Sequence, residues 1–358
     1  MALRYLFRIF FLTLVISLVG CAPETPTLPV AGVPTSQEPS RPLRLFLVRS
    51  YGTEDIWGQQ IRAGVLETLS RNGYDRVEGN LVLTEFTLNA ERYTGAEVNE
   101  AVLSTVLNAI ESSLPHVVLV ADDEAARSVI PNYPDPEQIF VYCGLNGDPE
   151  AYGITGDNIT GVLERPYPVQ TVRMAQDLGN QVTQVLIMSD TSLSGKASAE
   201  DIYEILNAPD APPVEVVREA TGEWETWQRV VREEFGKVDG VLMGQHAGLL
   251  NEAGETVPED EVLAYTLENS PVPVFGLWLG DVQRGAAGGL TISPYEQGRA
   301  AADLVVRIAR GEAPSALAPT LPERNVLAVN IAAVERWSLN VPLELLVSAR
   351  VYRRFPAP

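Results

Sequence analysis

Polar and aromatic side chains directly follow six apolar runs of the sequence, and they are residue types that bind small molecules in protein clefts. The clusters are Ser50-Tyr51, Asp122-Asp123, Gly144-Leu145-Asn146, Asp190-Thr191-Ser192, Gly244-Gln245-His246 and Trp278-Leu279-Gly280-Asp281. Ligands of open parallel sheets bind outside the carboxyl ends of the strands. If the chain forms two lobes that face each other, the six clusters meet in one cleft.

Two adjacent carboxylates, Asp122 and Asp123, form the most acidic of these clusters. A carboxylate in a largely apolar cleft pairs with an amino group or accepts hydrogen bonds from hydroxyls. Asp is equally common as the cap of a following helix, which here runs through Val129. Both roles stay open, and the two residues could divide them.

Aromatic and amide side chains stand in the loops after three other apolar runs. Tyr51 and Trp57 lie where a strand gives way to a helix, so their rings could line a ligand site or pack within a lobe. For Trp278, ligand contact and packing are equally open. Asn146 precedes Gly147 and Asp148, a turn signature that is favoured over a role in reading a polar ligand group.

Asp190 and Thr191 precede a predicted helix. Such side chains cap a helix, and the free amides at its start also bind an anion or a carboxylate, so both uses are open. The two histidines of the chain, His116 and His246, are expected to be structural.

Motifs of catalysis and metal binding are missing from the sequence. It contains no HExxH, CxxC, GxSxG or Walker motif, and Ser194-Gly195-Lys196 lacks the glycines that surround phosphates. With two histidines, only Asp122-Asp123-Glu124 stands out as a carboxylate cluster for a metal. An acid pair can do general acid and base work, but we expect no enzyme, no metal and no cofactor.

The composition is that of a folded protein with an acidic surface. The 358 residues suggest two domains, and 46% hydrophobic with 20% charged residues can bury a sizeable core. A formal charge of −21 repels a nucleic-acid backbone, so nucleic acid is excluded as a partner.

The first 20 residues read as a signal peptide. Arg4 and Arg8 precede an apolar run from Ile9 to Val19, which is shorter than the roughly 20 residues that span a bilayer. The run ends in Leu18-Val19-Gly20-Cys21, which resembles the bacterial lipobox. The resemblance implies lipidation of Cys21 and a membrane-anchored protein outside the cytoplasm, on the periplasmic face or cell surface. Cys143 then has no partner for a disulfide.

Residues 21–42 are expected to form an extended spacer after the lipidated residue. Six prolines stand among Thr, Ser and Glu between Ala22 and Pro42, with little apolar content. In a polyproline conformation of about 3.1 Å per residue, this segment could reach roughly 60 Å from the membrane.

The rest of the chain alternates short β-rich runs with helical patterns. The predicted strands are Leu43 to Val48, Leu81 to Leu88, Val117 to Ala121, Ile139 to Tyr142, Val182 to Ser189, Val214 to Arg218, Val238 to Met243 and Pro273 to Trp278. Helical periodicity is clearest over Ile56 to Leu69, Val98 to Ile110 and Tyr295 to Ala309. The alternation predicts an α/β fold with doubly wound parallel sheets.

Several segments between residues 43 and 349 resemble the ABC-transporter substrate-binding lipoproteins of the tryptophan/tyrosine-binding type. They are Ser50-Tyr51 with Trp57 and Gly64, Asn158-Ile159-Thr160-Gly161-Val162, Pro273-Val274-Phe275-Gly276, Gly288-Gly289-Leu290, Tyr295-Glu296-Gln297-Gly298-Arg299-Ala300-Ala301, and Asn330 to Trp337 with Val341-Pro342-Leu343-Glu344-Leu345-Leu346. No single motif is decisive for this resemblance, which depends on the order and spacing of the motifs together.

The resemblance implies a type I periplasmic-binding-protein fold with a ligand cleft between two lobes. Lobe 1 would hold residues 43–162 and about 288–312, and lobe 2 residues 163–287 and about 313–358. Glu164 then falls at the first crossover between lobes as a cleft carboxylate. The implied ligand-binding residues are Ser50, Tyr51, Trp57, Asp122, Asp123, Asn146, Glu164, Asp190, Thr191, Gln245 and Trp278.

The resemblance further implies a monomer that hands a small polar or amino-acid-like solute to an ABC permease and its ATPase. Asp122-Asp123 stand where relatives that bind aromatic amino acids carry small polar residues, so an aromatic amino acid is one candidate among cationic, zwitterionic and hydroxyl-rich solutes. Two alternatives of other classes stay open. One is a sensing module for a membrane receptor, and the other is a structural lipoprotein with an empty cleft.

Overall fold

Five apolar runs of the first half of the chain pair into one parallel sheet. The computed structural model describes residues 42–90, 98–179 and 182–356, so Cys21 and the predicted signal peptide and spacer lie outside the described residues. The strand order is β2-β1-β3-β4-β5. The strands are β1 (Leu43–Arg49), β2 (Leu81–Thr87), β3 (Val117–Ala121), β4 (Phe140–Leu145) and β5 (Ile159–Leu163).

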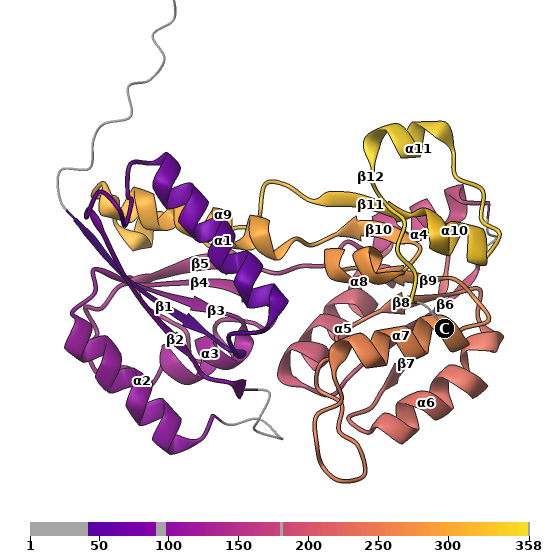
Figure 1. Ribbon diagram of the computed structural model, residues 1–358, viewed down its shortest axis with the longest axis horizontal. Coiled ribbons are helices and arrows are strands. Elements are labelled where there is room, and N and C mark those ends of the chain that lie inside the picture. Colours follow the sequence, from indigo (N-terminus) through magenta and orange to yellow (C-terminus); the bar gives the residue numbers. More distant parts are fainter. Residues whose placement is uncertain (1–41, 91–97, 180–181, 357–358) are drawn as a thin grey trace, which may run out of the picture. The chain divides into compact units, whose positions relative to one another are not determined.

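Helices cover both faces of this first sheet (Figure 1). Leu45 and Leu47 point into a core under α1 (Ile56–Arg71) and α9 (Pro294–Ala309). Phe46 and Val48, which alternate with them, point into a core under α2 (Glu100–Ser113) and α3 (Asp123–Val129). This alternation is why a continuous apolar run such as β1 is buried on both sides.

A second parallel sheet has the order β7-β6-β8-β9. Its strands are β6 (Gln184–Ser189), β7 (Glu215–Ala220), β8 (Gly240–Met243) and β9 (Val274–Gly276). The helices packed against it are α4 (Pro168–Asp177), α5 (Leu193–Leu206), α6 (Trp224–Glu233), α7 (Glu259–Asn269) and α8 (Leu279–Arg284), with the 3-10 turn η2 (Phe235–Lys237) after α6. The α/β fold class with parallel sheets is therefore confirmed.

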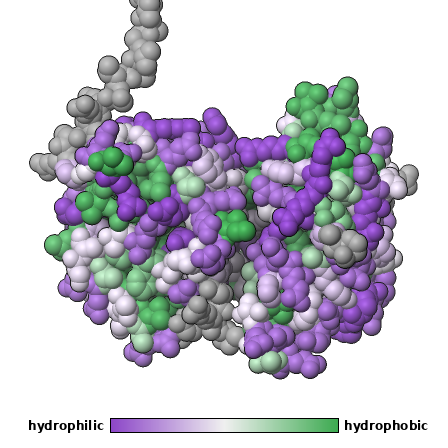
Figure 2. All heavy atoms as spheres, viewed as in Figure 1, coloured by the Kyte–Doolittle hydropathy of each residue, from purple (hydrophilic) through white to green (hydrophobic). Residues whose placement is uncertain are grey.

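The last part of the chain forms a small mixed sheet. In it β10 (Gly288–Thr291) runs antiparallel to β11 (Val326–Asn330), and β11 runs parallel to β12 (Arg350–Tyr352). The remaining helices are α10 (Ile331–Arg336), α11 (Leu343–Ser348) and the 3-10 turn η3 (Pro314–Ala316). Leu343 and Val347 on α11 are 71% and 81% exposed and belong to the hydrophobic surface seen over this helix in Figure 2.

Three segments connect the first sheet to the other two. The first segment follows β5, the second precedes α9, and the third follows Thr320. The backbone of Thr320 pairs with that of Leu163. The backbone of β10 pairs with β11, and that of Thr320 pairs with Val162 in β5. The assignment of lobes stays a prediction. No helix among the described residues is long and apolar enough to cross a membrane.

Two glycines allow α1 and α9 to cross at backbone contact. A Cβ atom at Gly64 would lie 2.1 Å from the carbonyl oxygen of Tyr295, and one at Gly298 would lie 2.0 Å from the carbonyl oxygen of Ile61. Both obstacles are backbone atoms, which cannot rotate away. The close crossing of α1 and α9 therefore depends on the absence of side chains at Gly64 and Gly298.

We predict that Gly64→Ala destabilises the protein by about 2 kcal/mol or more, because the added methyl group forces the two helices apart. The measurement is urea unfolding followed by circular dichroism. Gly236→Ala is the control, since its Cβ would meet only Pro271 Cγ at 3.7 Å. Equal stability of the two variants would contradict the close helix crossing.

Candidate functional site

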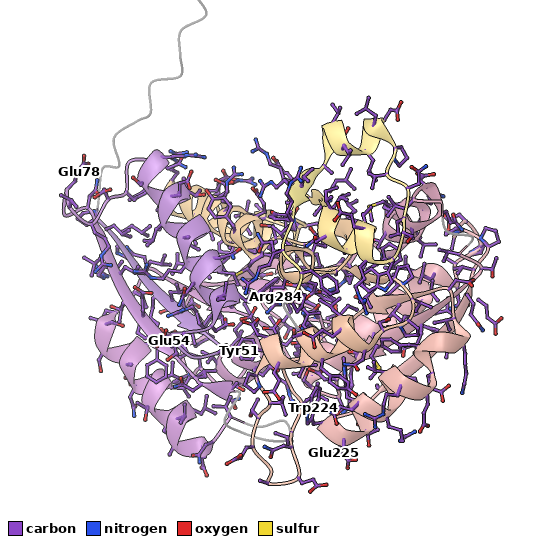
Figure 3. The ribbon with its side chains drawn as sticks, turned by 45° about the vertical axis from the view of Figure 1, so that its right-hand side comes forward. Tyr51, Glu54, Glu78, Trp224, Glu225 and Arg284 are labelled. Carbon is purple, nitrogen blue, oxygen red and sulfur yellow. The ribbon has the colours of Figure 1, made fainter. Side chains whose placement is uncertain are left out.

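Tyr51 lies in the loop after β1 (Figure 3). Carboxylates that follow strands of both parallel sheets lie close to it. Burial raises the pKa of Tyr51 well above its usual value, and the charges of Glu124, Asp122, Asp123 and Asp190 raise it further, in that order. The first three acids follow β3, and Asp190 follows β6. The structure thus brings strand ends of the two sheets close enough for their charges to interact.

Asp123 is a fully satisfied acceptor in this cluster. Its carboxylate accepts hydrogen bonds from the backbone and side chain of Asn146, the backbone of Gly147, the Tyr152 hydroxyl and the Ser194 hydroxyl, over 2.8–3.2 Å. Ser194 stands on α5, which packs on the second sheet, so this 2.8 Å bond connects elements of the two sheets. Five donors therefore occupy the Asp123 carboxylate within the protein, and its contact with a ligand stays a prediction.

Asp122 precedes α3 but does not cap it with its side chain. Its Oδ1 accepts a 2.8 Å hydrogen bond from Trp57 Nε1, while its Oδ2 is buried without a hydrogen-bond partner. Its backbone φ of 72° is unusual for a residue other than Gly and stores strain, a feature that clusters at functional sites. Burial raises the pKa of Asp122 well above its usual value despite the Trp57 bond, and the neighbouring acids, Glu164 first, raise it further.

Glu164 repeats this pattern at the crossover after β5. It is 1% exposed, its Oε1 accepts a 2.7 Å hydrogen bond from Trp278 Nε1, and its Oε2 has no hydrogen-bond partner. Burial, reinforced by the charge of Asp123, raises the pKa of Glu164 to about 7, although the hydrogen bond from Trp278 and the charge of Arg165 oppose the shift. Trp278 follows β9, so this bond also joins elements of the two sheets.

Glu124 is a third carboxylate with a displaced pKa. Its Oε2 accepts a 3.1 Å hydrogen bond from the Tyr51 hydroxyl. Burial and the adjacent Asp123 raise its pKa to about 7. Trp57 completes the surroundings, since its ring packs against the apolar cores of both sheets.

The other predicted residues have their polar groups engaged or lie at the edge of the cluster. The Ser50 hydroxyl donates to the Ala121 carbonyl and accepts from the Ala125 amide, which ties β1 to α3. Both Asp190 oxygens are bonded, one to Ser192 and one to the Gly248 amide. Asn146 donates to Asp123 but keeps a buried Oδ1 without a hydrogen-bond partner.

Thr191 is exposed, and Gln245 is half-buried. The backbone carbonyl of Gln245 accepts from the Asp190 amide at 2.7 Å, so its position is set by main-chain pairing. Ligand contact by these predicted residues stays a prediction.

The cluster is closed to solvent in this structure. Asp122, Asp123, Glu164 and Asp190 are each at most 4% exposed. Two surface hollows of about 400 and 230 Å³ are lined by other residues, among them Arg350 for the first and Tyr133 for the second. A molecule can therefore reach the unpartnered carboxylate oxygens only if the two sheets move apart.

Sequence reasoning missed Arg49 and Ser194, and it considered Glu124 only as part of a carboxylate cluster for a metal. Arg49 ends β1 and is 6% exposed, yet its Nε and Nη1 have no hydrogen-bond partner. Its positive charge acts to lower the pKa values of Asp55 and Glu85. Burial acts in the opposite direction and is the largest single influence on both pKa values. The available signal was the alternation Leu45, Leu47, Arg49, which places the arginine on the buried face under α1.

Comparison with known proteins shows what this arrangement is similar to. Residues 150–352 match the family described as ABC transporter substrate binding protein. A conserved domain protein from Vibrio cholerae O1 biovar El Tor has a similar structure, with a TM-score of 0.67 and 18% identity over 87% of this chain and 100% of the other. No match was found among curated proteins.

Two further solved structures are similar at 14% identity. One is the ABC domain in complex with L-Trp from Streptococcus pneumoniae, with a TM-score of 0.66 over 86% of this chain and 99% of the other. The other is the ligand-free, open structure of a substrate binding protein with adhesive properties from Clostridium difficile, with a TM-score of 0.64 over 87% and 99%. These likenesses show a type I periplasmic-binding-protein fold.

We predict unequal losses of stability when the charge is removed from one or the other of the two adjacent aspartates. Asp123→Asn should lower the free energy of unfolding by about 3 kcal/mol, because the new amide group faces buried donors. Asp122→Asn should change it by less than about 1 kcal/mol, because the Asn oxygen still accepts from Trp57 and no other bond is lost. Urea unfolding of both variants tests this, and equal losses would contradict the assignment of Asp123 as the structural member.

We also predict that stability falls as the pH rises through the neutral range. The pKa of Glu164 is about 7 in the folded chain against 4.5 ordinarily, so the folded state binds more protons between these values. The contribution of Glu164 to the free energy of unfolding is therefore highest below about pH 4.5. It declines up to about pH 7 and then levels off. Glu164→Gln should remove this contribution and add up to about 3 kcal/mol above pH 7.

The measurement is urea unfolding at a series of pH values for the wild type and Glu164→Gln. Glu225→Gln is the control, because Glu225 is an exposed residue of α6 (Figure 3). Parallel stability curves for the wild type and Glu164→Gln would contradict the raised pKa.

Proposed function

Because the chain belongs to the family of ABC transporter substrate binding proteins, we propose that it captures a small polar solute with a protonated amino group for import. The solute would be amino-acid-like or another small amine. It would be bound between the two parallel sheets, at the carboxylates that follow β3 and β5. Solute capture of this kind needs neither catalysis nor a cofactor.

The observation that carries the proposal is the pair of buried carboxylate oxygens, Asp122 Oδ2 and Glu164 Oε2, that lack hydrogen-bond partners. Ionised, such groups are costly to bury unless a cation and hydrogen-bond donors compensate them. An ammonium group supplies one positive charge and three donors. A cationic solute group between Asp122 and Glu164 would therefore be stabilised by both acids.

The aromatic residues around the two carboxylates fit the same solute class. The indole N–H groups of Trp57 and Trp278 are used on Asp122 and Glu164, so each carboxylate keeps one oxygen for a further donor. Aromatic ring faces attract ammonium groups electrostatically and pack against apolar parts of a ligand. Tyr51, Trp57 and Trp278 would provide such faces once the sheets separate.

Capture would proceed by separation and closure of the two sheets about the connecting segments. The closed arrangement is held by the hydrogen bonds Ser194–Asp123 and Trp278–Glu164, both between elements of different sheets. Both bonds engage residues of the acidic cluster. A solute that neutralises Asp122 and Glu164 would thus stabilise the closed arrangement more than the open one, as capture requires.

Delivery to a permease and its ATPase, and action outside the cytoplasm, are supported by the family match. Anchoring by a lipid on Cys21 and a spacer over residues 21–42 is supported by the lipobox-like sequence Leu18-Val19-Gly20-Cys21. No observation on the described residues favours the sensing module or the structural lipoprotein over import.

The test is isothermal titration calorimetry of tag-free protein, unfolded and refolded to remove bound solute, against amino acids, polyamines, nucleosides, sugars and dicarboxylates. L-Trp belongs in the panel because the Streptococcus pneumoniae protein was solved with it. We predict that the tightest binder carries an ammonium group and that Asp122→Asn and Glu164→Gln each weaken it at least about tenfold. Glu225→Gln should bind as the wild type does.

The same titration should depend on pH. Because binding requires the carboxylates in their ionised form and the pKa of Glu164 is about 7, affinity should fall as the pH drops below neutrality. The fall should reach about tenfold per pH unit for each proton released on binding. A dicarboxylate as the tightest binder, or an affinity that rises on acidification, would contradict the proposal.

A further inference from the structure

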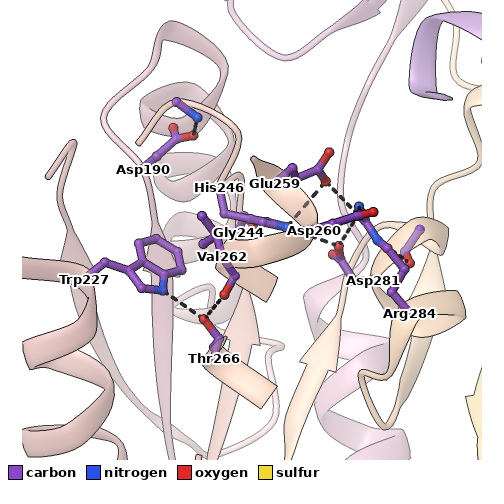
Figure 4. Close-up of polar contacts among 12 residues, drawn as sticks. Asp190, Trp227, Gly244, His246, Glu259, Asp260, Val262, Thr266, Asp281 and Arg284 are labelled. Atoms are coloured by element: carbon purple, nitrogen blue, oxygen red, sulfur yellow. Dashed lines mark hydrogen bonds and ion pairs between the residues drawn. The ribbon is translucent and has the colours of Figure 1, made fainter. Parts of the chain in front are cut away.

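A second cluster of metal-ligating side chains lies on the loop after β8 and on α7 and α8 (Figure 4). It contains His246, Glu259 and Asp281, which each offer one ligand atom, all within 4.8 Å of one another. The Nε2 atom of His246 lies 3.4 Å from Glu259 Oε1 and 3.8 Å from Asp281 Oδ1. None of these residues forms part of the acidic cluster around Tyr51.

The histidine is oriented as metal-binding histidines are. Its Nδ1 lies 3.0 Å from the carbonyl oxygen of Gly244, an acceptor, so Nδ1 carries the proton and donates it. The lone pair of a neutral imidazole is then on Nε2, which faces the two carboxylates. A backbone carbonyl that holds the other ring nitrogen is the usual outer support of a ligating histidine.

Two atoms of the cluster are buried and lack hydrogen-bond partners. They are His246 Nε2 and Asp281 Oδ2, in side chains that are 4% and 2% exposed. A lone pair that faces carboxylate oxygens at these distances is repelled unless a cation lies between them. This cation, whether a proton or a metal ion, must be shared by His246, Glu259 and Asp281.

Arg284 supports the two carboxylates from the other side. Its Nη2 donates to Glu259 Oε1 at 2.6 Å and to Asp281 Oδ1 at 3.4 Å, and its Nη1 donates to Asp260 Oδ1 at 2.6 Å. Each carboxylate oxygen has more than one lone pair, so these bonds leave acceptor capacity on both groups. Ligating carboxylates are commonly hydrogen-bonded in this way.

We propose that His246, Glu259 and Asp281 bind a divalent transition-metal ion, for which Zn²⁺ is the best-matched probe. One imidazole and two carboxylates form a mixed nitrogen and oxygen ligand set of the kind that zinc accepts. Tetrahedral zinc with bonds of about 2.0–2.2 Å separates its ligands by about 3.3–3.6 Å. The 3.4 Å separation lies in this range, and the 3.8 Å separation needs a small contraction. All three ligand atoms lie within 4.8 Å of one another, so the side chains would close around the ion.

The proposed metal site is independent of solute capture. All three ligands come from segments that pack on or follow strands of the second sheet, so the site forms without closure of the two sheets. Its loss should leave solute affinity unchanged. A failure of either proposal can therefore be recognised separately.

The test is calorimetric titration of full-length, tag-free protein with ZnCl₂ after EDTA treatment and dialysis. We expect one equivalent of Zn²⁺ to bind the wild type, and His246→Gln to weaken this binding at least about tenfold. His116→Gln is the matched control, since His116 is the other histidine and should leave zinc affinity unchanged. Thermal unfolding of each variant without zinc verifies that it is folded.

Because the chain has two histidines, ¹⁵N NMR of the imidazoles gives a direct readout of zinc binding at each one. Zinc should shift the Nε2 signal of His246 and leave the signals of His116 unchanged. Absence of zinc binding to the wild type, or equal zinc affinity in His246→Gln, would overturn the proposal. In that case the cluster is an ion-pair network in which a proton on His246 supplies the positive charge.

Discussion

Burial of carboxylates without matching cations is the constraint on which the account of this protein depends. Asp122, Asp123 and Glu164 are nearly inaccessible to solvent. The charge of Glu164 helps raise the pKa of Asp122, and the charge of Asp123 helps raise the pKa of Glu164. Asp123 is compensated by five hydrogen-bond donors. The other two acids each have one indole donor and one oxygen left over. This difference separates Asp123, which is engaged within the structure, from Asp122 and Glu164, which we propose bind the solute.

The second cluster shows how the same chain compensates acids permanently. Arg284 donates to Glu259, Asp260 and Asp281. Burial alone would lower the pKa of Arg284, but these acids outweigh it and raise the pKa above its already high value. Among the described residues, no arginine or lysine forms an ion pair with Asp122 or Glu164. Arg49 is buried nearby but ends β1 under α1, where it acts on Asp55 and Glu85. The positive charge missing at the strand ends is therefore the charge we assign to the solute.

The sequence predicts the framework better than the site. β1 and α1 are recognisable because a buried strand is a continuous apolar run and because α1 repeats apolar residues at helical spacing behind its cap, Asp55. The predicted strands do not include β5, β10, β11 and β12. The last three are short and belong to a small mixed sheet. The convergence of strand ends was predictable from the topology of parallel sheets, and the structure brings Tyr51, Asp122, Asp123 and Asp190 within electrostatic reach. The roles of Asp122 and Asp123 were not predictable, because they depend on donors such as Tyr152 and Ser194 that lie far away in the sequence.

The most direct test of the account is the titration of the Glu164 carboxyl, followed by its ¹³C chemical shift in protein labelled at glutamate, with Glu164→Gln for assignment. Without solute, the account predicts a midpoint near 7 in place of the ordinary 4.5. With an ammonium-bearing solute bound, the midpoint should move to lower pH, because the cation stabilises the carboxylate. An ordinary midpoint in the solute-free protein would contradict the claim that an uncompensated buried carboxylate selects the solute.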